Sequence, residues 1–126
     1  MSPATREWVD KAEGDFNMAQ QQSRARKAPN FDGGCFYAQQ CIEKYLKGLL
    51  QQRLTQFPKT HHLEKLIDLL PWDAVWDSLR ARLIALNPYA VEFRYPGMTA
   101  DKALLRNAMI VCRAVRNHAR FILGLK

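Results

Sequence analysis

Apolar residues recur at intervals of three and four along most of the chain, which is the spacing of one face of an α-helix. Ser2 and Pro3 suit an N-cap and a first helical position, and Pro29 disfavours helix in the residue before it. We therefore expect a first helix from Pro3 to about Ala28. Its buried stripe consists of Trp8, Ala12, Phe16 and Ala19.

A second apolar stripe predicts a helix from about Gly34 to about Leu54, after a loop over residues 29–34 that contains proline and two glycines. Phe57 and Pro58 interrupt the pattern, and Thr60 then suits the cap of a short third helix. The apolar face of the second helix consists of Cys35, Ala38, Ile42, Tyr45, Leu46, Leu49 and Leu50. That of the third consists of Leu63, Leu66, Ile67 and Leu70.

Two further helices are predicted after the next prolines. The fourth runs from Asp73 to about Leu86, and the last from a cap at Thr99 to about Leu123. The inward residues of the fourth are Val75, Trp76, Leu79, Leu83 and Leu86. Those of the last are Leu104, Ala108, Val111, Val115 and Ile122.

Five predicted helices with short connections indicate an all-α fold, an antiparallel up-and-down four-helix bundle with one additional short helix. Strand-like alternation is confined to residues around Val91–Tyr95. Trp72 and Trp76 lie one helical turn apart, and we expect both in the core. A length of 126 residues fits one domain that spans 1–126.

The composition adds a basic balance to this picture, with 19 Lys and Arg against 12 Asp and Glu. Small basic proteins often meet polyanions. The longest apolar run, Ala108–Cys112, is far shorter than the roughly 20 residues of a membrane-spanning helix. The three cysteines have no metal-ligand spacing, which fits reduced thiols. With no signal-peptide pattern, we expect a cytoplasmic protein.

The positive charge gathers on the last predicted helix, because no acidic residue follows Asp101. At 100° per residue, five basic side chains fall within about 80° of one another. They are Lys102, Arg106, Arg113, Arg116 and Arg120. Three explanations stay open for this stripe: a solvated face, an anionic partner, or acidic residues of a neighbouring helix or subunit, such as Glu7, Asp10 or Glu13.

Three blocks in order along the chain resemble the HEPN family of helical domains. In the first, at 35–50, an aromatic residue, Ala-Gln-Gln and a Glu-Lys-x-x-Lys run share one helix. The second is Lys-Thr-His-x-Leu at 59–63, and the third joins Leu-Asn-x-Tyr at 86–89 to Arg-Tyr-Pro at 94–96. Trp8, Ala12, Asp15 and Ala19 also fit the family's first helix, so the resemblance covers nearly the whole chain.

This resemblance implies a bundle that usually forms a homodimer and is associated with nucleotides or RNA. It also implies a possible partnership with a nucleotidyltransferase, in a toxin–antitoxin-like system. Members that cleave RNA carry an Arg, four to six residues and a His on the last long helix. Arg113 and His118 have that spacing.

The proposed pair has sound chemistry but imperfect geometry. A His can take the proton of a 2′-hydroxyl, and an Arg can stabilise the charge that develops on the phosphorus centre. However, Ala114 replaces the polar residue that usually follows the Arg, and a five-residue step turns the two side chains about 140° apart. His118 can equally be a histidine at the edge of the core.

Several other polar residues are candidates for ligand contacts. The side chains that we expect to contact a nucleotide or RNA are Arg94, Tyr95, His61, Lys44, Lys47, Arg106, Arg116 and Arg120. Alternatively, Glu43 and Lys47 form a helix-stabilising pair, and Gln40 makes a hydrogen bond across a bundle or dimer seam. His61 and His62 lack a third ligand at a zinc spacing, so we expect no metal and no cofactor.

Two function classes remain. One is a non-catalytic binding module, a homodimer that binds a nucleotide, RNA or a nucleotidyltransferase. The other is a metal-independent, toxin-like endoribonuclease that uses Arg113 and His118. The residue after Arg113 and the phase of the pair favour the binding module.

Overall fold

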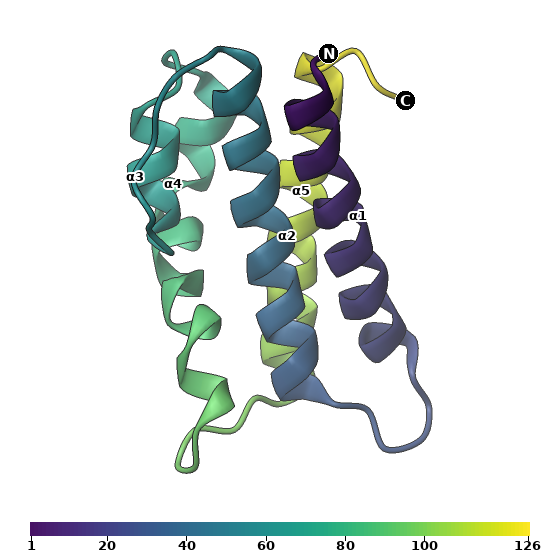
Figure 1. Cartoon of the computed structure of the whole chain (residues 1–126). Coiled ribbons are helices and arrows are strands. Elements are labelled where there is room, and N and C mark those ends of the chain that lie inside the picture. The colour runs from purple at the N-terminus through teal and green to yellow at the C-terminus, as the bar shows by residue number, and fades with distance from the viewer.

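The computed structural model describes the whole chain, residues 1–126, except for the side chain of Arg94. Its long helices are α1 (Pro3–Arg24), α2 (Phe31–Gln52), α4 (Ala74–Leu86) and α5 (Lys102–Ile122), and its short one is α3 (Leu63–Asp68). Two 3₁₀ turns, η1 (Asn87–Ala90) and η2 (Glu92–Arg94), lie between α4 and α5. Among the described residues there is no β-strand. The long helices run alternately down and up (Figure 1), so the predicted all-α bundle with one short extra helix is confirmed.

Side-chain caps fix where the helices begin. The Ser2 hydroxyl accepts from the Thr5 N–H, as the Ser-Pro start of α1 predicts. Asn30 caps α2 by accepting from the Gly33 N–H, so this helix begins three residues before the predicted Gly34. The predicted cap at Thr99 is wrong, because Asp101 accepts from the Leu104 N–H and α5 begins at Lys102.

Two other predicted ends also differ. α1 ends at Arg24 rather than Ala28, because Ala25 is extended and Ala28 has a positive φ of 45° before Pro29. Thr60 does not cap α3, whose N-cap residue is His62. The Thr60 hydroxyl instead accepts from the His62 N–H and so shapes the turn before the helix.

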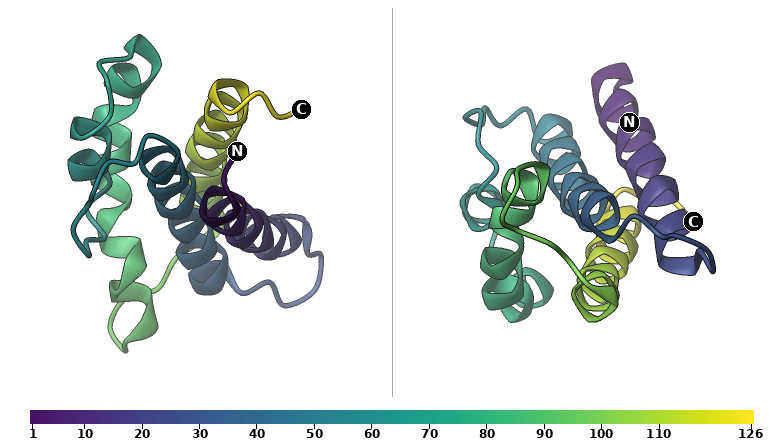
Figure 2. Two further views of the ribbon diagram at one scale, coloured as in Figure 1. Left: turned by 45° about the horizontal axis from the view of Figure 1, so that its top comes forward. Right: turned by 90° about the horizontal axis from the view of Figure 1, so that it is seen from below.

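α2 is the central helix of the bundle, with α1 and α5 on one side and α3 and α4 on the other (Figure 2). Its side chains Ile42, Tyr45 and Leu46 are completely buried. Burial of one such apolar side chain stabilises the fold by about 1.5–3 kcal/mol. At Gly34 a Cβ atom would stand 2.9 Å from the Leu105 methyl carbons and 3.2 Å from Gln22, so α1, α2 and α5 meet closely there.

Some apolar residues lie outside this core, contrary to the helical pattern. Trp76 is buried as predicted, but Trp72 is 80% exposed, because it precedes α4 and projects from the connection after α3. Val75 and Ile122 are also exposed rather than inward-facing. Residues 91–95 do not form a strand, because the backbone there turns through η2.

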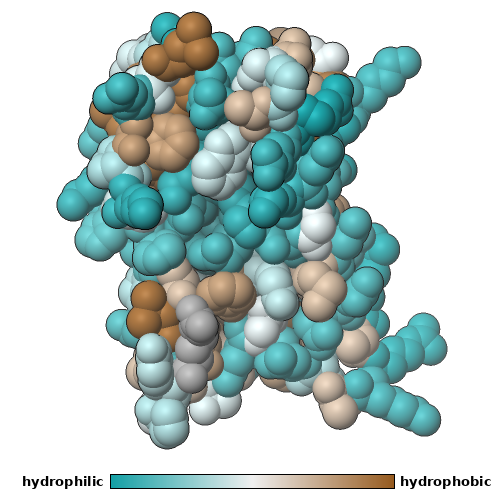
Figure 3. Space-filling model, in the orientation of Figure 1, coloured by the Kyte–Doolittle hydropathy of each residue, from teal (hydrophilic) through white to brown (hydrophobic). Residues whose placement is uncertain are grey.

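No helix in the described chain combines the length and the apolar character needed to cross a membrane. Hydrophilic side chains cover much of the face shown in Figure 3, above all over α1.

Candidate functional site

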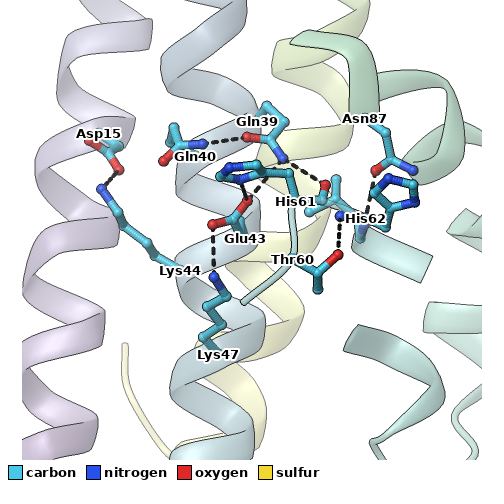
Figure 4. A network of polar contacts seen from close by, with 11 residues as sticks. Asp15, Gln39, Gln40, Glu43, Lys44, Lys47, Thr60, His61, His62 and Asn87 are labelled. Atoms are coloured by element: carbon cyan, nitrogen blue, oxygen red, sulfur yellow. Dashed lines mark hydrogen bonds and ion pairs between the residues drawn. The ribbon is translucent and has the colours of Figure 1, made fainter. Parts of the chain in front are cut away.

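The first two sequence blocks meet in a buried polar network between α2 and the segment before α3 (Figure 4). The Glu43 carboxylate accepts from the Lys47 ammonium at 3.0 Å and contacts the His61 Nδ1 at 2.8 Å. The Gln39 amide donates to Glu43 and to the His61 carbonyl, each at 3.3 Å. Gln40 donates in turn to Gln39 at 2.7 Å.

This network belongs to the core, and its buried polar atoms all have hydrogen-bond partners. Gln39, Glu43 and Lys47 are respectively 0%, 4% and 8% exposed. The Lys47 ammonium also lies 5.8 Å from the ring centroid of Trp8 and 6.0 Å from that of Phe57. Every buried side-chain N or O atom that the structure describes has a partner, so the network ties α2 to the α3 segment.

The lysines of this motif are therefore committed to internal partners. Lys47 holds Glu43, and Lys44 pairs with Asp15 of α1 at 2.6 Å. His61 is the network residue that reaches solvent, since 55% of its side chain is exposed. The first two sequence blocks that carry the family resemblance thus join α2 to α1 and to the segment before α3.

His118 faces the beginning of α4. Its Nε2 lies 2.9 Å from a carboxylate oxygen of Asp73, whose other oxygen accepts from the Val75 and Trp76 N–H groups. The ring packs edge-on against Trp76 at 4.7 Å between centroids and stacks on Phe121 at 6.3 Å. Burial alone would raise the pKa of Asp73, but the hydrogen bonds from His118 and the two N–H groups outweigh it and lower that pKa.

Arg113 lies on a different flank of α5. Arg116 and Arg120, which follow it on nearly the same face, reach α1, whereas His118 reaches α4. The five-residue step between Arg113 and His118 turns them about 140° apart. Within one chain, the two residues do not converge on a common site.

Two arginines of the basic stripe have an acidic partner inside the fold. Arg116 donates twice to the Glu13 carboxylate, both at 2.7 Å, and its guanidinium lies 4.5 Å from the Phe16 ring centroid. Arg120 lies 3.6 Å from the same carboxylate and donates to the Tyr45 hydroxyl. Burial would raise the pKa of Glu13, yet the bonds from Arg116 and Tyr45 lower it. The open choice for the stripe is thus settled for these two residues in favour of a neighbouring acid.

The rest of the stripe has no such neutralisation. Within the described chain no ion pair involves Lys102, Arg106 or Arg113. The Tyr95 side chain is 62% exposed, and the Arg94 side chain lies outside the described residues. Of the described candidates for RNA contact, Lys44, Lys47, Arg116 and Arg120 have acidic partners inside the fold, whereas His61, Tyr95 and Arg106 are exposed.

The described residues contain no group of three or more His, Cys, Asp or Glu side chains that could hold a metal ion. Cys35, Cys41 and Cys112 are free thiols and fully buried. A hydrogen bond with Cys112, together with burial, raises the pKa of Cys41. Such thiols are poor nucleophiles.

The acidic residues that link the helices are only partly evident from the sequence. Glu13 is one of three acids that the sequence offers to the basic stripe, and its phase and level on α1 distinguish it from Glu7 and Asp10. Asp73 was expected only as the start of α4, and nothing in the sequence links it to His118, forty-five residues later. Such pairings depend on which helices become neighbours.

Comparisons with known proteins agree with this arrangement. Residues 5–122 match the family model described as the HEPN domain. The structure is similar to the crystal structure of TT1696 from Thermus thermophilus, with a TM-score of 0.79 and 22% identity over 95% of this chain and 98% of that chain. At this identity the similarity shows the fold alone. No curated protein matches the chain.

Proposed function

The chain belongs to the HEPN domain family, and from this premise we propose that it is a non-catalytic binding module, a homodimer that associates with a nucleotide or with RNA. A nucleotidyltransferase is the proposed protein partner, in a toxin–antitoxin-like pair. The module would act by holding its ligand or partner, without a cleavage step of its own.

The observation that carries the non-catalytic assignment is the divergence of His118 from Arg113. Metal-independent cleavage needs a general base and a cation at the same phosphate group. The His118 Nε2 contacts Asp73 at the start of α4, and its ring lies between Trp76 and Phe121 with 17% of the side chain exposed. With Arg113 on the other flank of α5, this histidine serves to join α5 to α4.

The face shared by α4 and α5 supports the dimer. A groove of about 430 Å³ between these helices is lined by Leu86, Tyr89, Leu104, Ile110 and Val111, among others. Ile110, in the groove, is 51% exposed, and Phe121, on the same face of α5, is 77% exposed. Exposed apolar side chains grouped in this way are typical of protein interfaces.

An assay that measures binding and cleavage on the same RNA tests the assignment. We expect fluorescein-labelled single-stranded RNA to bind, as seen in anisotropy, and to remain intact on a denaturing gel. Arg113→Ala should not change the gel, and neither should Arg6→Ala, an exposed control on α1. RNA fragments that disappear with Arg113→Ala, but not with Arg6→Ala, would show the endoribonuclease instead.

A further inference from the structure

Two segments without acidic residues become neighbours in the folded chain. No Asp or Glu occurs between Asp15 and Asp32, and none follows Asp101. The first segment forms the second half of α1 and the loop after it, and the second forms α5. The basic residues that they bring together, apart from those near Glu13 and Lys126 at the end of the sequence, are Arg24, Arg26, Lys27, Lys102, Arg106 and Arg113.

We propose that these six residues, the basic seam, form the surface of this protein that binds the backbone of single-stranded RNA. The proposal rests on the proposed function and names the site at which the binding module meets its ligand.

The helical phase places Arg24 and Arg106, the two central residues of the seam, on the side where α1 and α5 meet. The two helices are antiparallel (Figure 1), and Glu13 marks their contact by pairing with Arg116 and Arg120. Arg24 follows Glu13 by eleven residues, about three turns, and points within about 20° of it. Arg106 precedes Arg120 by fourteen residues and points within about 40° of it.

The same arithmetic puts the two arginines at one level. Arg24 lies about 16 Å along α1 from Glu13, and Arg106 lies about 15 Å back along α5 from Arg116. The helices meet near that level, where Gly34 lies close to both Gln22 and Leu105. At one end of the α1–α5 contact, Glu13 therefore neutralises positive charge on α5. At the other end, Arg24 and Arg106 approach each other without an acidic residue between them.

The seam is exposed, and the acidic residues at the beginnings of α2 and α5 accept hydrogen bonds from backbone N–H groups. Arg24, Arg26, Lys27, Lys102 and Arg106 are exposed, and Arg113 is half-buried. Asp32 accepts from the Ala100 N–H at 2.6 Å, and Asp101 accepts from the Leu104 N–H at 2.8 Å. None of the six basic side chains has an ion pair among the described residues.

The chemistry of the seam suits phosphodiester groups. Guanidinium groups bind phosphate oxygens in pairs of hydrogen bonds, and side-chain amides add neutral contacts to phosphate, sugar or base. On α1, the positions between Glu13 and Arg24 that face the seam are Asn17 and Gln20. A row of cations with amides between them fits a strand of phosphates better than a single small anion.

The test compares two double variants that remove the same amount of positive charge. The seam variant is Arg24→Gln with Arg106→Gln, and the control is Arg6→Gln with Lys11→Gln, both exposed on the first half of α1. Affinity for fluorescein-labelled single-stranded RNA should fall about tenfold in the seam variant and stay unchanged in the control. The slope of log K against log salt should become shallower by about 1.4, about 0.7 for each phosphate group that is no longer bound.

Melting temperature provides a second readout. The seam variant should melt at the same temperature as the wild type or slightly higher, because repulsion between Arg24 and Arg106 is removed. An equal loss of RNA affinity in both variants, or none in the seam variant, would overturn the seam while the proposed function stands. Wild-type protein that binds no RNA would overturn the seam and leave only nucleotide or nucleotidyltransferase binding for the proposed module. Binding to vesicles of anionic lipid without RNA binding would assign the seam to a membrane instead.

Discussion

Glu13, Glu43 and Asp73 each hold side chains that could otherwise bind a ligand. Glu13 holds Arg116 and Arg120, Glu43 holds Lys47 and His61, and Asp73 holds His118. Each contact joins segments distant in sequence, apart from the Glu43–Lys47 pair within α2. At the residue scale, the acids of this basic chain therefore decide which cations remain available.

Replacing Glu43 tests whether its network stabilises the fold. Glu43→Ala should lower the free energy of unfolding by about 3–5 kcal/mol, because the buried Lys47 ammonium loses its counter-charge. Urea denaturation monitored by circular dichroism measures this loss. A double variant, Glu43→Leu with Lys47→Met, should recover much of it, because no unpaired charge remains. A loss of less than about 1 kcal/mol in Glu43→Ala would contradict the stabilising role.

At the scale of elements, the periodicity of apolar residues predicted all five helices, because burial of one face dictates that spacing. It could not place their ends, which depend on single caps such as Asn30 and Asp101. Nor could spacing along α5 tell that Arg113 and His118 face different neighbours. That required the order of helices around α2, which follows from packing of the whole chain.

The contact between α4 and α5 should depend on pH. The pKa of Asp73 is lowered in the folded protein, so its stabilising contribution is present above the pKa of the unfolded state and is lost as pH falls through the lower, folded value. Melting temperatures of wild type and Asp73→Asn should therefore differ at pH 7 and converge in acid, below about pH 4. Asn retains the cap, so the difference reports the carboxylate. A constant difference across this range would contradict the argument, and Glu13, whose pKa is also lowered, adds the same slope to both proteins.

At the scale of the whole molecule, the two sides of the bundle have different characters. The α1–α5 side carries the basic seam, and the α4–α5 side carries the groove and the exposed apolar side chains. A homodimer formed through the apolar side would leave both seams open to solvent. Assembly and RNA binding would then use separate surfaces.

Light scattering after size exclusion tests the dimer. We expect a mass of about twice 14.6 kDa at micromolar concentration. Ile110→Asp, in the groove between α4 and α5, should shift the mass toward the monomer, because a buried charge is costly at an interface. Arg24→Gln on the opposite side should leave it unchanged. A wild-type monomer at every concentration would refute the dimer.

The unequal packing around α2 implies an order in which the chain loosens. α2 packs extensively on both α1 and α5, whereas α4 meets α5 less extensively, through contacts that include the Asp73–His118 pair, the Trp76 ring and the walls of the groove. Local opening begins where the fewest apolar contacts must break, so α3 and α4 would detach as one cooperative unit before the other three helices separate. Such a partial opening would free His118 from Asp73 without unfolding α5. His118, which the closed bundle confines, would thus be exposed for a small fraction of the time. The free energy of detaching α4 sets that fraction.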